Sequence, residues 1–194
     1  RDTKERLECN FGMCHPEGYR KAMRMMKMAE KFSLPVVCLV DTPGAYPGVG
    51  SEERGVAQAI AINMLEMSRL ATPIAVAVIG EGASGGAIGI GVGDNMGMMQ
   101  FAWYSVISPE GCAAILWRTG EKAAEAAEAM QVTAQSMKKH DLIDDIIEEP
   151  LGGAHRDPDE AAYNLERYFV STLRRLKRTP IEKLVEDRYH RWRR

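Results

Sequence analysis

The sequence contains no apolar run close to the roughly 18 residues that a membrane-spanning helix requires. Its first residues also lack the charged and then apolar pattern of a secretory signal peptide. The formal net charge is only −2 over 194 residues, so charge alone does not draw the chain to nucleic acid or to a membrane surface. From these absences we expect a cytoplasmic chain of one domain, 1–194, with no membrane or nucleic-acid partner.

Cysteine is scarce, and its spacing excludes the familiar metal frameworks. Cys9, Cys14, Cys38 and Cys112 show no repeated C-x-x-C spacing. Cys38 lies inside an apolar run, which indicates reduced thiols of the cytosol rather than disulfides. A zinc site built from Cys9, Cys14 and His15 would lack a fourth ligand, so we predict no metal site in this chain.

Two short apolar runs, 36–40 and 74–79, predict strands that are buried on both faces of a sheet. Between them, apolar residues at three- and four-residue steps predict a helix that Ser51 caps. A strand–helix–strand unit places its two strands parallel and adjacent, with a right-handed crossover. The loops that follow the strands, 41–50 and 80–86, should therefore meet at the carboxyl edge of the sheet, where α/β proteins bind ligands.

The loop 80–86 holds four glycines in seven positions and fits several patterns. The G-x-G-x-x-G that begins at Gly80 matches the dinucleotide fingerprint. No acid lies between Asp94 and Glu110, so the residue that would bind a ribose is missing.

The same loop contains G-x-S-x-G around Ser84, the nucleophile elbow of hydrolases, which needs a later histidine and acid. His140 and His155 lie far downstream in polar, turn-like sequence. A third interpretation is an oxyanion hole made of backbone amides alone. A glycine-packed turn with no function is the fourth, and the meeting of two unusual loops favours a functional site over it.

The remaining patterns predict a short series of further elements. Residues 1–13 read as extended and polar, and the run 88–92 fits either a strand or a glycine-packed helix. Predicted elsewhere are a helix from Pro16 to before Pro35, two short strands at 96–101 and 103–107, helices from Ser108, near 121–130 and from Thr133, an extended piece at 142–147, and helices opened by capping boxes at Asp157 and Thr179.

The C-terminal end is locally basic. Residues 165–194 contain ten Lys or Arg against four Asp or Glu, a difference of +6. A solvated helix face explains this charge, and a dock for an acidic partner or a phosphate-bearing cofactor is the alternative. Aromatic residues are too few here to suggest a nucleic-acid stacking platform.

Several separate motifs resemble one known family, the alpha subunits of bacterial acetyl-CoA carboxylase carboxyltransferase. They are spread along nearly the whole chain, which would correspond to the C-terminal two-thirds of a family member without its N-terminal region. The motifs are Asn10–Met13, Pro16–Ala22, Asp41–Gly48, Glu52–Gly55, Gly80–Gly86, Ser105–Cys112 and Glu149–His155.

The resemblance implies an α/β fold of the ClpP/crotonase type, a spiral of ββα repeats with C-terminal helices. It also implies that biotin, carried on the biotin carboxyl carrier protein, delivers a carboxyl group to acetyl-CoA to give malonyl-CoA for fatty acid biosynthesis. The expected partners are the carboxyltransferase beta subunit, in an α2β2 heterotetramer, and the carrier protein. Zinc is expected only in the beta subunit.

Carried onto this sequence, the resemblance assigns the backbone N–H groups of Gly85 and Gly86 as the catalytic oxyanion donors. The surrounding carboxybiotin side would be formed by Gly82, Ala83, Ser84, Gly44, Ala45 and Tyr46. The family has glycine where this chain has Ala83, and we expect function to survive because Ala83 lies outside the donor pair. We also expect Gly86→Val to block the approach of biotin and to leave the fold intact.

Two other functions remain open from the sequence. A ClpP-like serine peptidase would share the fold and use Ser84 as its nucleophile, so Ser84→Ala would abolish its activity. A non-catalytic interaction subunit would leave all of the chemistry to a partner.

Overall fold

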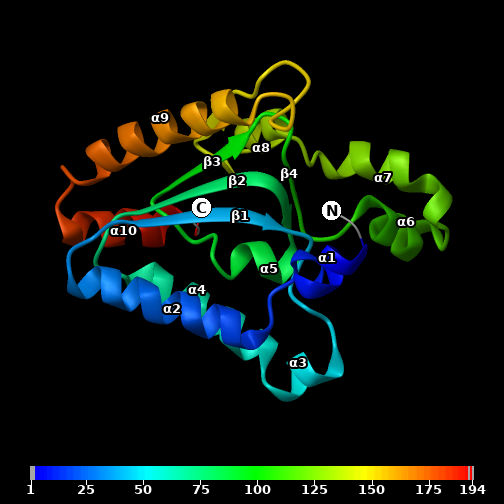
Figure 1. The fold of residues 1–194 in the computed structure, drawn as a ribbon, viewed down its shortest axis with the longest axis horizontal. Helices are drawn as coiled ribbons and strands as arrows, with labels where there is room; N and C mark the ends of the chain where they lie inside the picture. The colour runs from blue at the N-terminus through cyan, green and yellow to red at the C-terminus, as the bar shows by residue number, and fades with distance from the viewer. Residues whose placement is uncertain (1–2, 192, 194) are drawn as a thin grey trace.

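In a computed structural model, which describes residues 3–191 and 193, the chain forms one parallel sheet with helices on both faces (Figure 1). The strand order is β1-β2-β3-β5, and β4 also pairs with β2. The named strands pair in parallel, and β1 and β2 are parallel neighbours as the strand–helix–strand pattern predicts. The strands are β1 Val36–Thr42, β2 Ile74–Ala83, β3 Asn95–Met99, β4 Trp103–Ser105 and β5 Asp145–Ile147.

Strand β2 is the centre of the sheet, because its first five residues, Ile74–Val78, are completely buried. It pairs with β1 on one edge and with both short strands on the other. β3 pairs with Ala75–Val78 and β4 with Glu81–Ala83. The two predicted short strands therefore follow one another along β2.

Strand β1 differs from its prediction, since only one of its faces is buried. Val36, Cys38 and Val40 are buried, whereas Val37 and Leu39 are 45% and 48% exposed. Alternate side chains of a strand point to opposite faces, and only the face of β1 that carries Val36, Cys38 and Val40 is covered.

Helices α2 and α4 lie on one face of the sheet, and α9 lies on the other (Figure 1). Two of the predicted caps form: the Ser108 and Asp157 side chains accept from the amides of Gly111 and Glu160 at 3.1 and 3.0 Å. The helix predicted from Thr179 begins at Ile181. The helices are α1 Thr3–Glu8, α2 Pro16–Lys31, α3 Val49–Glu53, α4 Val56–Arg69, α5 Ser84–Ile88, α6 Pro109–Trp117, α7 Ala123–Met130, α8 Ala134–Lys139, α9 Pro158–Leu176 and α10 Ile181–Arg191, with 3-10 turns at Asn10–Gly12 and Gly120–Lys122.

Three local predictions were wrong. The chain is helical over Thr3–Glu8 rather than extended, because Lys, Glu, Arg and Leu are all good helix formers. Ser51 lies inside α3 and is not a cap; its hydroxyl instead lies 3.0 Å from His15 Nδ1. The run 88–92 forms no strand, since α5 ends at Ile88 and irregular chain follows.

Helix α10 is fixed to the core by Arg188, which is 1% exposed. Its guanidinium donates to both carboxylate oxygens of Asp94, at 2.7 and 2.9 Å. It also donates to the carbonyl oxygens of Met67, Leu70 and Thr72 at 2.7 to 2.9 Å. One of the ten cations at the basic end is therefore an internal clamp at the start of β2.

Candidate functional site

The two unusual loops meet, as the sequence predicts, at the carboxyl ends of β1 and β2. Thr42 and Gly82 are partners at the end of the ladder. A Cβ added to Gly86 would lie 2.5 Å from the carbonyl carbon of Gly44 and 2.7 Å from its oxygen. The two main chains are thus in direct contact, and only glycine at position 86 permits it.

A short N-terminal segment braces this contact. The Thr42 hydroxyl lies 2.8 Å from the carbonyl oxygens of both Gly12 and Gly44, and accepts from the Gly44 amide at 3.2 Å. Cys14 forms a parallel bridge with Ala45. The motif around Gly12 is therefore placed against the 41–50 loop, 30 residues away in sequence.

The segment 80–86 is more regular than a glycine-rich loop. Strand β2 continues to Ala83, and α5 begins directly at Ser84, which has φ +54°. Gly85 and Gly86 fall in the first turn of α5, where backbone N–H groups have no partner within the helix. Near Asp41, the Glu81 amide donates to the Asp41 carboxylate at 3.0 Å, which ties the ends of β1 and β2 together.

Ser84 and Gly85 line a cavity of about 570 Å³, which we call the site cavity. Its lining combines these two residues with hydroxyl-bearing and apolar side chains of β4 and of the helices that follow. The other lining residues are Ile88, Tyr104, Ser105, Val106, Met130, Met137 and Leu142. One wall thus offers polar groups and the facing helices offer thioether and aliphatic surface, which suits a ligand with one polar and one apolar edge.

The other predicted site residues lie around this cavity rather than on it. Gly82 is covered by Tyr104, whose Cδ2 atom would be 2.7 Å from a Cβ at position 82. Ala83 is 2% exposed. Gly44 and Ala45 pack against α5 and the N-terminal segment, so they shape the site from beneath.

Tyr46 is directed to a separate polar cluster at the starts of α2 and α3. Its ring centroid lies 4.4 Å from that of His15, and His15 Nδ1 contacts Ser51. Arg54 donates to Glu17 at 2.7 Å in the same cluster. Sequence reasoning missed this arrangement; the adjacency of His15 to the Pro16 helix start was the one available signal.

A small apolar cluster supports the site from below. It contains Tyr19, Val56 and Ala59, with Ala45 and Ile60 packed against it, and Ile60 Cδ1 would lie 3.1 Å from a Cβ on Gly85. The Tyr19 hydroxyl is buried without a hydrogen-bond partner, and burial raises its pKa to about 12.

No histidine is placed to activate Ser84. Among residues 3–191 and 193, no hydrogen bond joins Ser84 to an imidazole: His15 contacts Ser51 and His140 contacts Gln131. The nucleophile-elbow pattern is therefore present as backbone geometry and lacks its base, which disfavours the peptidase alternative.

The described residues also bear on metals and membranes. Within residues 3–191 and 193 there is no group of three His, Cys, Asp or Glu side chains that could hold a metal ion. Over the same residues, no helix has the length and apolarity needed to cross a bilayer.

Comparison with solved structures shows the fold. Transcarboxylase 12S is similar with a TM-score of 0.66 and 23% identity, over 82% of this chain and 32% of that one. The beta subunit of geranyl-CoA carboxylase from P. aeruginosa has a TM-score of 0.65 and 17% identity, over 87% of this chain and 33% of that one. The predicted crotonase-type α/β class is confirmed by these carboxyltransferase folds.

Sequence relatives are much closer. The acetyl-coenzyme A carboxylase carboxyl transferase subunit alpha of Coxiella burnetii is 56% identical over 99% of this chain and 61% of its own length. That of Haemophilus ducreyi is 58% identical over 98% of this chain and 60% of its own length. The chain thus spans about three-fifths of these relatives.

The family model described as acetyl co-enzyme A carboxylase carboxyltransferase-like matches residues 1–194. Two of the family motifs, Asp41–Gly48 and Gly80–Gly86, are in contact at the carboxyl edge of the sheet. The chain belongs to the acetyl co-enzyme A carboxylase carboxyltransferase-like family.

Proposed function

We propose that this chain is the larger part of the alpha subunit of a bacterial acetyl-CoA carboxylase carboxyltransferase. It would transfer the carboxyl group of carboxylated biotin to acetyl-CoA and so form malonyl-CoA. The observation that carries the proposal is the 56–58% identity to alpha subunits over nearly the whole chain. The contact of the two glycine loops beside the site cavity supports it independently.

The proposal includes the assembly. The chain would act in the cytoplasm as one carboxyltransferase domain over 1–194, with a beta subunit in an α2β2 heterotetramer and with the biotin carboxyl carrier protein. The beta subunit would hold the zinc and most of the acyl-CoA site. Multi-subunit relatives of the same fold, such as the hetero-tetrameric malonate decarboxylase of Pseudomonas, support an assembly of this kind.

The site cavity would hold the bicyclic ring of biotin. Ser84 and Gly85 give it a polar wall for the ureido edge, and Met130 and Met137 give it a soft, polarizable wall for the sulfur-containing ring. Biotin, when bound, supplies the carboxyl group and a ureido nitrogen that can accept the methyl proton of acetyl-CoA.

The role of this chain would be electrostatic. The amides of Gly85 and Gly86 would donate to the oxygen on which negative charge develops, and each such donor is worth roughly 10²–10³ in rate. Gly44 and Ala45 would hold the amides in place through the contact beneath them, and Gly82, Ala83 and Ser84 would shape the carboxybiotin side. Tyr46, which packs on His15 in the separate polar cluster, would take no direct part. Because the proposed donors are backbone amides, the site would need no side chain that acts as a general acid or base.

The test uses the full-length protein assembled with its beta subunit. Decarboxylation of malonyl-CoA with biocytin as acceptor should proceed. Ser84→Ala should lower the rate by no more than about tenfold, the effect of one neutral hydrogen bond, because a nucleophilic hydroxyl is not needed. Loss of all turnover in Ser84→Ala, together with labelling of Ser84 by a fluorophosphonate, would overturn the proposal in favour of a serine hydrolase. Absence of turnover in the wild-type assembly would overturn it outright.

A further inference from the structure

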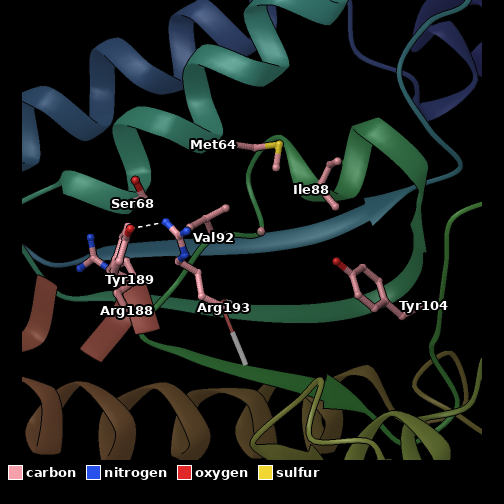
Figure 2. Close-up of a pocket in the computed structure, with 9 residues that line it drawn as sticks. Met64, Ser68, Ile88, Val92, Tyr104, Arg188, Tyr189 and Arg193 are labelled. Carbon is pink, nitrogen blue, oxygen red and sulfur yellow. Dashed lines mark hydrogen bonds between the residues drawn. The ribbon is translucent and has the colours of Figure 1, made fainter. Parts of the chain in front are cut away.

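Helix α5, which carries the proposed oxyanion donors, borders open space on two sides. Ser84 and Gly85 at its start line the site cavity. Ile88 at its end lines both that cavity and a second one of about 310 Å³ between α4, α5 and α10 (Figure 2). Because the helix has only five residues and adjoins two cavities, its position depends on its contacts with the rest of the protein.

The two ends of α5 are held by different contacts. At the far end, the buried Asn63 side chain donates to the Gly89 carbonyl at 3.1 Å. At the site end, the Gly44 backbone lies against Gly86, where an added Cβ would approach the Gly44 oxygen to 2.7 Å. The direction of the Gly86 amide therefore depends on where Gly44 lies.

Gly44 does not hold this position through a conformational preference of its own. Its φ of +150° is one that residues with a side chain rarely adopt, and glycine moves easily between many conformations. An external contact has to select this one. The Thr42 hydroxyl provides it, since it accepts from the Gly44 amide at 3.2 Å and lies 2.8 Å from the Gly44 carbonyl oxygen.

An irregularity in the ladder between β1 and β2 places this hydroxyl. Val40 pairs with Val78. Two residues further along β1, Thr42 pairs with Gly82, which is four residues further along β2. Bulges of this kind re-aim side chains and are frequent next to active sites. The hydroxyl also lies 2.8 Å from the Gly12 carbonyl oxygen, so Thr42 joins the end of β1 to the N-terminal segment and to the 41–50 loop.

We propose that Thr42 is a positioning residue of the carboxyl-transfer site. Its hydroxyl fixes Gly44, Gly44 fixes the first turn of α5, and that turn aims the Gly86 amide at the oxygen on which negative charge develops. This inference rests on the proposed function and adds a side chain that does not line the site cavity. Because a displacement of about 1 Å can cost roughly 100-fold in rate, loss of the hydroxyl should lower turnover much more than substrate binding.

The test compares Thr42→Val and Thr42→Ser in the full-length protein assembled with its beta subunit. Val has the shape of Thr and lacks the hydroxyl. We therefore expect the kcat of malonyl-CoA decarboxylation, with biocytin as acceptor, to fall roughly 10- to 100-fold, while the KM for malonyl-CoA stays within about twofold of the wild type. Ser keeps the hydroxyl, so its kcat should stay within about threefold. A role in stability alone would not separate kcat from KM in this way.

Thr72→Val is the matched control, because it deletes the same kind of hydrogen bond at the opposite end of the sheet. The Thr72 hydroxyl donates to the Leu34 carbonyl at 2.7 Å, and Thr72 is 1% exposed. This variant should lower the unfolding midpoint at least as much as Thr42→Val does, and its kcat should remain close to that of the wild type. If Thr42→Val does not assemble, Thr42→Ala takes its place as the variant without the hydroxyl.

Amide hydrogen exchange adds a measurement that does not depend on turnover. The backbone amides of α5 should exchange faster in Thr42→Val than in the wild type, and Thr72→Val should leave them unchanged. A Thr42→Val protein that keeps more than a third of the wild-type kcat, or that leaves exchange in α5 unchanged, would overturn the inference and leave the proposed function standing. The same holds if Thr42→Ser is as impaired as Thr42→Val. A wild-type assembly without turnover would overturn the proposed function and this inference with it.

Discussion

The two ends of strand β2 are stabilised in opposite ways. At its amino end, one long side chain, Arg188, uses its guanidinium nitrogens on Asp94 and on three carbonyl oxygens. At its carboxyl end, Gly86 and Gly44 bring two main chains together because neither has a side chain. The amino end of β2 is thus held by one buried side chain. The proposed oxyanion site at its carboxyl end depends on glycines, which have no side chain.

Arg188→Met should give the largest loss of stability. It removes five hydrogen bonds and leaves the buried Asp94 carboxylate without its counter-charge, with the Ile74 amide still donating to it at 2.7 Å. Breaking a buried ion pair on one side costs about 3–5 kcal/mol. Chemical denaturation would measure the change in the free energy of unfolding. Lys183→Met is the control: its ion pair with Asp187 is largely exposed, so the change should stay within about 0.5 kcal/mol. A loss below 1 kcal/mol for Arg188→Met would show that the clamp is dispensable.

Gly86→Ala should lower carboxyl transfer by roughly 10²–10³, because one displaced oxyanion donor has about that effect. The structure also corrects the expectation that a side chain here leaves the fold intact. A Cβ at position 86 meets the Gly44 backbone at 2.5 Å, so the added methyl should also destabilise the protein by about 1–3 kcal/mol.

Gly120→Ala is the matched control for this variant, since nothing lies within 4 Å of a Cβ at Gly120. Turnover and unfolding free energy should stay close to those of the wild type. A Gly86→Ala enzyme that keeps more than a tenth of wild-type turnover would remove the glycine contact from the site.

Tyr19→Phe should give the smallest effect at neutral pH, because the buried hydroxyl has no partner to lose. The difference should emerge in alkali. The folded-state pKa of Tyr19 is raised from 10.0 to about 12, so the unfolded chain loses its proton first and stability falls as the pH rises from 10 to 12. Unfolding titrations across that range should show a shallower fall for Tyr19→Phe than for the wild type. An equal slope would mean that Tyr19 is not desolvated.

Local and short-range features could be predicted from the sequence. Apolar runs and caps determine β2, α6 and α9, and the strand–helix–strand rule then brings the loops after β1 and β2 together. The confirmed family membership also rests on local motifs. The assignment of Gly85 and Gly86 as donors stays a prediction.

What could not be predicted depends on contacts between distant residues. Arg188 and Asp94 are 94 positions apart in the sequence. The sequence of a basic helix does not show which of its arginines face water and which face the core. The exposed face of β1 depends on which other elements pack against the strand, which the residues of the run do not encode.

The hydrogen bond from Thr42 to Gly12 makes the segment around Gly12 part of the structure that supports the Gly44–Gly86 contact. Gly12 and Cys14 lie outside the five strands. They contact Thr42 and Ala45 and so help to hold the 41–50 loop where Gly44 contacts Gly86. A protein shortened to begin at Pro16 would keep all five strands and lose the support that sets the spacing of its proposed anion donors.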